Sequence, residues 1–120
     1  MAFGQGLTFL KEIPLKKDEV KKILVKYDGY EKLFKFRWTL FTNDTLTVLK
    51  SYDLIVSQIV LYDDLKCRSF RFYLKPKGAS NYNVPYFLVK FKKFDFKKNK
   101  AIFELYIFDR EMEINLEYLN

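Results

Sequence analysis

The side chains that most often perform catalysis near neutral pH are missing from this chain of 120 residues. It contains no histidine, which is the commonest general base and the commonest zinc ligand. Catalytic pairs of serine or cysteine with histidine and all histidine-based metal triads are therefore excluded. Gly4 and Gly6 form a short G-x-G, but no phosphate-binding signature continues from it.

The remaining chemistry belongs to carboxylates and to one thiol. Asp63 and Asp64 are adjacent and Asp53 is near in sequence, so a magnesium-dependent carboxylate enzyme is one hypothesis. A solvated turn between two strands is the interpretation we favour, because aspartates are common turn residues. Cys67 lies between Lys66 and Arg68, which would suit a reactive thiol, but a small buried hydrophobic role is the favoured one. We predict no enzyme, no cofactor and no metal site.

Charge gives a sharper hypothesis about binding. Residues 66–100 carry eleven Lys/Arg against one Asp/Glu, whereas residues 101–120 carry one against five, within a net charge of +7. Aromatic residues are interleaved with the basic ones, and lysines with aromatics are what a protein needs to hold single-stranded nucleic acid. Lysines on a solvated sheet face and aromatics in the core would produce the same pattern.

The loop-like segment 75–85 and the hairpin 90–100 are the predicted contact region. The loop is rich in glycine, serine, asparagine and proline, and irregular segments on a rigid sheet often carry function. The predicted partner-binding residues are Lys75, Lys77, Ser80, Asn81, Tyr82, Asn83, Lys90, Lys92, Lys93, Lys97, Lys98 and Lys100.

One helix is predicted near the N-terminus, over residues 17–27. Val20, Ile23, Leu24 and Tyr27 recur at helical spacing, and Gly29 follows where a helix would end. Ile23-Leu24-Val25 could instead open a strand. A short strand before this helix is predicted to stop at Pro14.

The rest of the chain alternates with the period of a strand. Residues 34–40 place Phe34, Phe36, Trp38 and Leu40 on one face, and the phase slips near Lys93, where a β-bulge would fit. Residues 54–62 are nearly all apolar, which predicts a strand covered on both faces, although a buried helix shares this pattern. The last strand alternates apolar residues with Glu111, Glu113 and Glu117, which we assign to its wet face.

These elements predict one mostly-β domain over residues 1–120. It would be an antiparallel meander of about seven or eight strands, curled into a small barrel or sandwich, with the helix covering an end or a face. The single cysteine excludes an intrachain disulfide, and neither a secretory signal nor a membrane-spanning run is visible. We therefore expect a cytoplasmic protein that makes no membrane contact.

The leading functional hypothesis is a non-catalytic binding or assembly module. Its ligand would be another protein, or a second copy held through an edge strand. The alternative is a sequence-tolerant binder of single-stranded nucleic acid that uses the basic, aromatic-rich residues 66–100.

Overall fold

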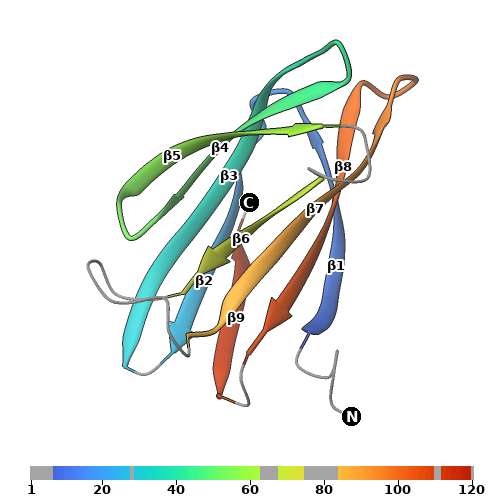
Figure 1. Cartoon of the computed structure of the whole chain (residues 1–120). Helices are drawn as coiled ribbons and strands as arrows, with labels where there is room; N and C mark the ends of the chain where they lie inside the picture. The colour runs from blue at the N-terminus through green and yellow to red at the C-terminus, as the bar shows by residue number, and fades with distance from the viewer. Residues whose placement is uncertain (1–6, 28, 63–67, 75–83, 110–111, 120) are drawn as a thin grey trace.

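The chain folds into two antiparallel β-sheets that pack face to face (Figure 1). The structure is a computed structural model that describes residues 7–27, 29–62, 68–74, 84–109 and 112–119. The described strands are β1 (Leu7–Lys16), β2 (Lys21–Tyr27), β3 (Tyr30–Thr42), β4 (Thr45–Tyr52), β5 (Ile55–Tyr62), β6 (Ser69–Tyr73), β7 (Tyr86–Asp95), β8 (Lys100–Phe108) and β9 (Ile114–Leu119).

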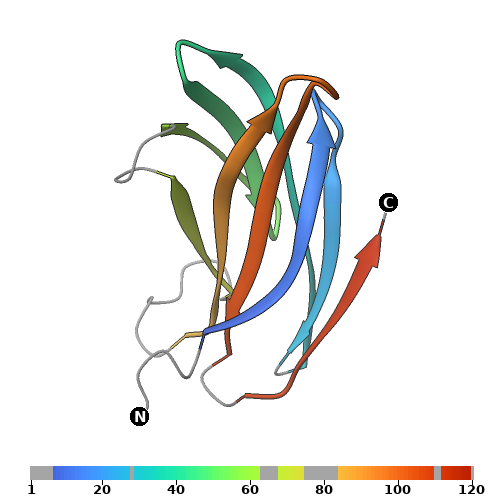
Figure 2. The ribbon, with the colours of Figure 1, turned by 90° about the vertical axis from the view of Figure 1, so that its right-hand side faces the viewer.

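The strand order explains why this is a sandwich and not a simple meander. One sheet has the order β1-β8-β7-β6 and the other has the order β5-β4-β3-β2-β9. Consecutive hairpins build most of each sheet, but β1 pairs with β8 and β9 pairs with β2. The first and last described strands therefore each join strands that are remote in sequence, and β9 lies beside β2 in Figure 2.

The core lies between the sheets and is unusually aromatic. Phe34, Phe36, Phe87, Phe91 and Phe103 are fully buried. Phe34 from one sheet lies 5.1 Å from Phe87 of the other, and Phe36 lies 5.2 Å from Phe103, measured between ring centroids. Tilted and edge-on pairs at these distances are the preferred arrangements of aromatic rings. The aromatic strands of the two sheets thus interlock.

The predicted helix over residues 17–27 is wrong, and none of the described residues is helical. Lys21–Tyr27 form strand β2, which has β3 on one side and β9 on the other. Ile23 and Val25 point into the core while Leu24 lies on the outer face, so the strand period outweighs the helical spacing. Gly29 has a φ of 80° in the tight turn that joins Tyr27 to Tyr30.

Two other predictions about strands are also corrected. Strand β1 continues through Pro14 to Lys16. Proline is tolerated here because β1 is an edge strand that pairs only with β8, so no neighbour on its other side needs a backbone N–H donor. Residues 55–62 do form a strand, but β5 is an edge strand with exposed apolar side chains and is not covered on both faces. The sheets also form no closed barrel.

Two β-bulges shift the side-chain phase at matching ends of the two sheets. In β3 the register slips between Trp38 and Leu40, and in β7 it slips between Phe91 and Lys93, as the sequence predicts for the latter. Each bulge turns the following aromatic inward, so that Phe41 and Phe94 pack against the core. Leu40 lies on the outer face instead of beside Trp38, and half of its surface is exposed.

Lys50 is a cation on the inner side of β4. Its Nζ donates a hydrogen bond to Ser57 Oγ at 2.7 Å and lies 4.8 Å from the centre of the Phe72 ring. No ion pair involving Lys50 is found in the described part of the chain. Partial burial lowers the pKa of Lys50, because a desolvated ammonium favours its neutral form.

We expect Lys50→Met to raise the free energy of unfolding by on the order of 1 kcal/mol near pH 7, since methionine is buried without desolvating a charge. The pKa of Lys50 is lower in the folded chain than in the unfolded chain. At pH values between this lowered pKa and the ordinary pKa of 10.5, the unfolded chain therefore binds more protons. Wild-type stability should therefore rise with pH in this window, and the variant should lack the rise.

Urea unfolding from pH 7 to 10 measures both effects, with Lys22→Met on the outer face of β2 as the matched control. Burial raises the pKa of Tyr52 above its ordinary value of 10.0, so this tyrosine destabilises the fold only at higher pH, where its unfolded form ionises. Equal pH slopes for wild type and Lys50→Met would show that Lys50 is not the source.

Candidate binding site

Two hairpin turns meet at one end of the sandwich (Figure 1). The β3–β4 turn has two residues, Asn43 and Asp44, with φ of 51° and 60°, the left-handed pair that a tight hairpin requires. The β7–β8 turn spans residues 96–99. Asp95 Oδ1 accepts hydrogen bonds from the backbone amides of Lys97 and Lys98, each at 3.1 Å, and so fixes this second turn.

Four aromatic rings from these hairpins form what we call the aromatic end cluster: Trp38, Phe41, Phe94 and Phe96. Phe41 and Phe94 stack with ring centroids 4.3 Å apart and planes 3° from parallel. Trp38 meets Phe94 edge-on at 5.5 Å, and its Nε1 donates to the Leu15 carbonyl at 2.7 Å. The cluster is therefore anchored to the core on its inner side.

Phe96 forms the solvent side of the cluster. It packs edge-on against Phe94 at 5.0 Å, yet 75% of its surface is exposed. A pocket of about 310 Å³ opens here and is lined by Lys17, Trp38, Leu40, Phe41, Phe94, Phe96 and Asn99. An exposed phenyl ring beside an apolar hollow is a feature of interaction sites more than of solvated turns.

Five lysines lie at this end of the sandwich, and Lys17 among them lines the pocket. We call them the end lysines: Lys16, Lys17, Lys97, Lys98 and Lys100. Lys16 and Lys100 face each other across the β1–β8 pairing, and Lys97 and Lys98 lie in the turn next to Phe96. Among the described residues no ion pair involves any of the five. The end therefore combines an apolar hollow with five lysines, although Asp44 and Asp95 also lie in its two hairpins.

The described members of the predicted contact residues lie in two places. Lys97, Lys98 and Lys100 belong to the end lysines, whereas Lys90, Lys92 and Lys93 lie on the outer face of the four-stranded sheet. The loop residues Lys75, Lys77, Ser80, Asn81, Tyr82 and Asn83 lie outside the described residues, as do Asp63, Asp64 and Cys67.

Acidic residues of neighbouring strands neutralise part of the basic segment. Lys92 Nζ lies 2.8 Å from Glu12 Oε2, and Lys90 Nζ lies 4.0 Å from Glu104 Oε1. The hydrogen bond with Glu12 raises the pKa of Lys92. Asp53, the described member of the predicted magnesium group, pairs with Lys32 at 3.0 Å. In the described ranges, no three His, Cys, Asp or Glu side chains lie close enough to hold a metal ion.

The predicted contact residues include none of the seven that line the pocket: Lys17, Trp38, Leu40, Phe41, Phe94, Phe96 and Asn99. The alternation before Thr42 places Trp38 and Leu40 together in the core and gives Phe41 to the outer face. Only the bulge between Trp38 and Leu40 reverses this, and no glycine or proline marks it in the sequence. The usable signal is the pair Phe94 and Phe96 beside a lysine-rich turn.

A second group of aromatic rings crosses the outer face of the four-stranded sheet. Tyr86 lies 5.4 Å from Tyr73 and 5.2 Å from Phe108, so three adjacent strands contribute to one row. The Arg71 guanidinium lies 4.8 Å from the centre of the Tyr86 ring. Rings beside arginine on an open sheet can stack with nucleic-acid bases.

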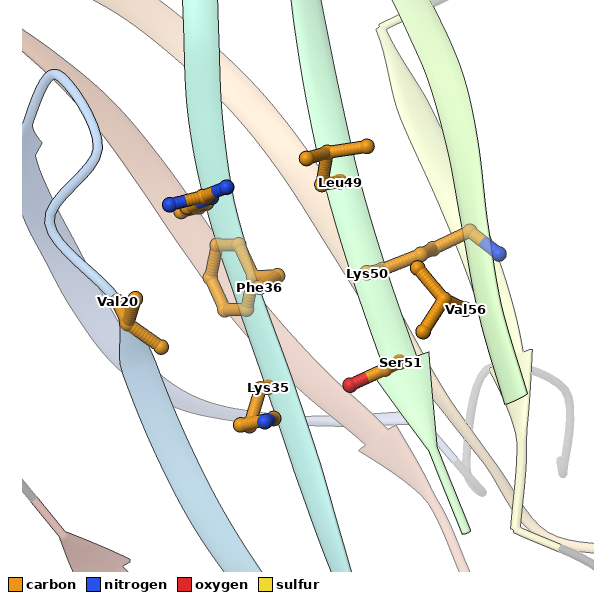
Figure 3. A pocket seen from close by; sticks show the side chains of 8 residues that line it. Val20, Lys35, Phe36, Leu49, Lys50, Ser51 and Val56 are labelled. Carbon is orange, nitrogen blue, oxygen red and sulfur yellow. The ribbon is translucent and has the colours of Figure 1, made fainter. Parts of the chain in front are cut away.

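A shallow pocket of about 250 Å³ lies on the outer face of the five-stranded sheet (Figure 3). Lys35 and Arg37 of β3 line it together with Leu49 and Ser51 of β4 and with Val56 of β5. Arg37 Nη1 is 4.0 Å from Asp18 Oδ1, whereas Lys35 and Lys50, which also line the pocket, have no ion pair among the described residues. This lining suits apolar or anionic groups and offers no pair of groups for acid–base catalysis.

No protein-family model, curated protein or solved structure matches the chain. No helix in the described part of the chain is long and apolar enough to cross a bilayer.

Within the aromatic end cluster, we expect Phe94 to stabilise the fold and Phe96 to contribute little to its stability. Phe94→Ala removes a ring that stacks on Phe41 and packs on the core, so we expect it to cost about 3 kcal/mol of unfolding free energy. Phe96→Ala removes a mostly exposed ring and should cost less than about 0.5 kcal/mol. Chemical denaturation measures both, and similar losses would mean that Phe96 is structural.

Proposed function

We propose that the chain is a non-catalytic binding module that holds another protein at the aromatic end cluster. The pocket beside Phe96 takes an apolar side chain of the partner, and the end lysines meet acidic groups around it. Burial of an aromatic anchor at the centre with charged groups at the rim is how compact protein interfaces obtain affinity and orientation.

The exposure of Phe96 carries this proposal. Phe96 keeps 75% of its surface in water although the rings of Phe41 and Phe94 lie 5.9 and 5.0 Å from its own ring, measured between centroids. The fold would keep its core without this ring, since Phe41 and Phe94 already close the end of the sandwich. A partner that covers both would explain an exposed phenylalanine beside lysines that form no ion pair among the described residues.

The charge pattern favours a partner that brings compact acidic groups to this end. Phosphate backbones need cations spaced along an extended path. In the described part of the basic segment, Lys90 and Lys92 are paired with Glu104 and Glu12, whereas Lys97, Lys98 and Lys100 near the pocket take part in no ion pair.

Site-specific photo-crosslinking tests this placement. A photoreactive phenylalanine analogue at Lys97 should trap a partner in native cell extract, and the same group at Lys93 should not, because Lys93 lies on the outer face of the four-stranded sheet. Combining Phe96→Ala with Lys98→Glu should reduce capture at least about tenfold, as expected when an anchor and a rim charge are lost together.

Lys93→Glu is the matched control, since it reverses a charge in the same strand but away from the pocket. Equal crosslinking from positions 93 and 97, or capture that the double variant leaves unchanged, would contradict the proposed site.

A second candidate function is binding of single-stranded nucleic acid on the outer face of the four-stranded sheet. The row of Tyr73, Tyr86 and Phe108 with Arg71 above it favours this candidate, because stacking rings and a cation are combined on one open face.

Fluorescence anisotropy with short single-stranded RNA and DNA measures this activity. Binding should weaken steeply with salt, and Arg71→Glu with Lys93→Glu should weaken it and lower the salt slope by about two, one for each lost phosphate contact. Lys97→Glu with Lys98→Glu should leave it unchanged. Absence of binding even at low salt would remove this candidate.

A further inference from the structure

In the part of the chain that the structure describes, strand β5 presents an edge without the usual protection against pairing. It lies at the end of the order β5-β4-β3-β2-β9, and its eight residues, IVSQIVLY, contain no charge, proline or glycine. It pairs with β4 over its full length without a bulge. Ile55, Val56, Val60 and Tyr62 are exposed, and Val56 keeps 69% of its surface in water. A long, apolar and regular edge is a template for another strand.

The three other sheet edges carry protective features. Strand β1 holds Lys11, Glu12 and Pro14 and is interrupted by a bulge. Strand β6 is only five residues long and includes Arg71. Strand β9 bears Glu117. The Lys11 side chain of β1 also lies against β9, with its Nζ 4.3 Å from the centre of the Tyr118 ring. Protection at three edges makes its absence at β5 informative.

We propose that β5 pairs in antiparallel fashion with β5 of a second copy of this chain, so that one continuous sheet runs through the dimer. A two-fold axis at this edge pairs β5 of one copy with β5 of the other. Neither β5 edge is then free to pair again, so the assembly stops at a dimer. This inference rests on a different surface from the end cluster and does not depend on the proposed function.

The side-chain pattern of β5 fits pairing with itself. Directly opposed residues of two strands lie on the same face of a sheet, so a two-fold pair centred on β5 can place Gln58 opposite Gln58 or Ile59 opposite Ile59. In the first register Val56 faces Val60 of the other copy, and in the second it faces Tyr62. Both registers join apolar side chains on the outer face.

Charge favours the second copy at this edge above all other edges. A chain of net charge +7 repels its own copies, and self-pairing of the other described edges would bring together the lysines of β1, the arginine of β6 or the glutamate of β9. Strand β5 brings no charged side chain to the joint. The nearest cation, Lys50, lies on the inner face, where Ser57 Oγ and the Phe72 ring hold its ammonium.

The expected dimer is weak. A pair of eight-residue strands buries less than the roughly 800 Å² per partner of a standard stable interface, so the monomer and dimer should exchange with concentration. The pocket that includes Val56 lies next to the joint, so the pockets of the two copies would be neighbours.

Sedimentation equilibrium of the full chain over a wide concentration range tests the proposal. We expect a monomer–dimer equilibrium, with a dissociation constant at least about tenfold higher for Val56→Lys and for Val60→Lys, since each places a lysine at the joint. Thr47→Lys is the matched control. Thr47 is directly opposite Val60 on the same face of the sheet, but it belongs to β4, which is already paired on both sides. This control should change the constant by less than about twofold.

Both edge valines are exposed, so the variants should fold, and thermal unfolding checks this. A chain that stays monomeric at every concentration would overturn the proposal and would leave the edge to a different protein. A dimer that both edge substitutions leave unchanged would overturn it as well, because the contact would then lie elsewhere.

Discussion

The interlocking of phenylalanine rings between the two sheets is the interaction on which the rest of this structure depends. Phe34 and Phe36 of one sheet lie against Phe87 and Phe103 of the other, and these rings hold the sheets in one relative position. The aromatic packing does not stop at the core. It continues through Phe91 to Phe41 and Phe94, so the end cluster is an extension of the core that reaches solvent at Phe96. A site built in this way is rigid on its inner side and open on its outer side.

The sequence predicts the class of this fold because strand periodicity is a local property. Phe34, Phe36 and Trp38 alternate inward as expected. The slip near Lys93 is also visible as a break in phase. The helix over residues 17–27 fails partly for a non-local reason: β3 pairs with β2 through a tight hairpin, but β9 supplies the partners on the other side from the far end of the described chain.

The candidate site is predicted only in part for the same reason. The lysine-rich turn can be found from composition, but Lys17 and Phe41 reach it through the pairing of strands far apart in the chain. Local charge counting also overstates the basic surface, because Glu12 and Glu104 come from other strands to meet Lys92 and Lys90. Similarly, an uninterrupted apolar run such as residues 55–62 suggests burial, and only the sheet order reveals that it is an edge.

The exchange of the terminal strands between sheets has a consequence for how the chain is made. Lys22 in β2 is opposite Leu119 in β9, so the outer flank of β2 has no partner until almost the whole described chain has left the ribosome. Pairings over such long sequence separations are slow to form, because the entropy of loop closure must be lost before the contacts are gained. A nascent chain of this protein would therefore expose β2 as a pairing edge during synthesis, and that interval is when chaperones would matter most.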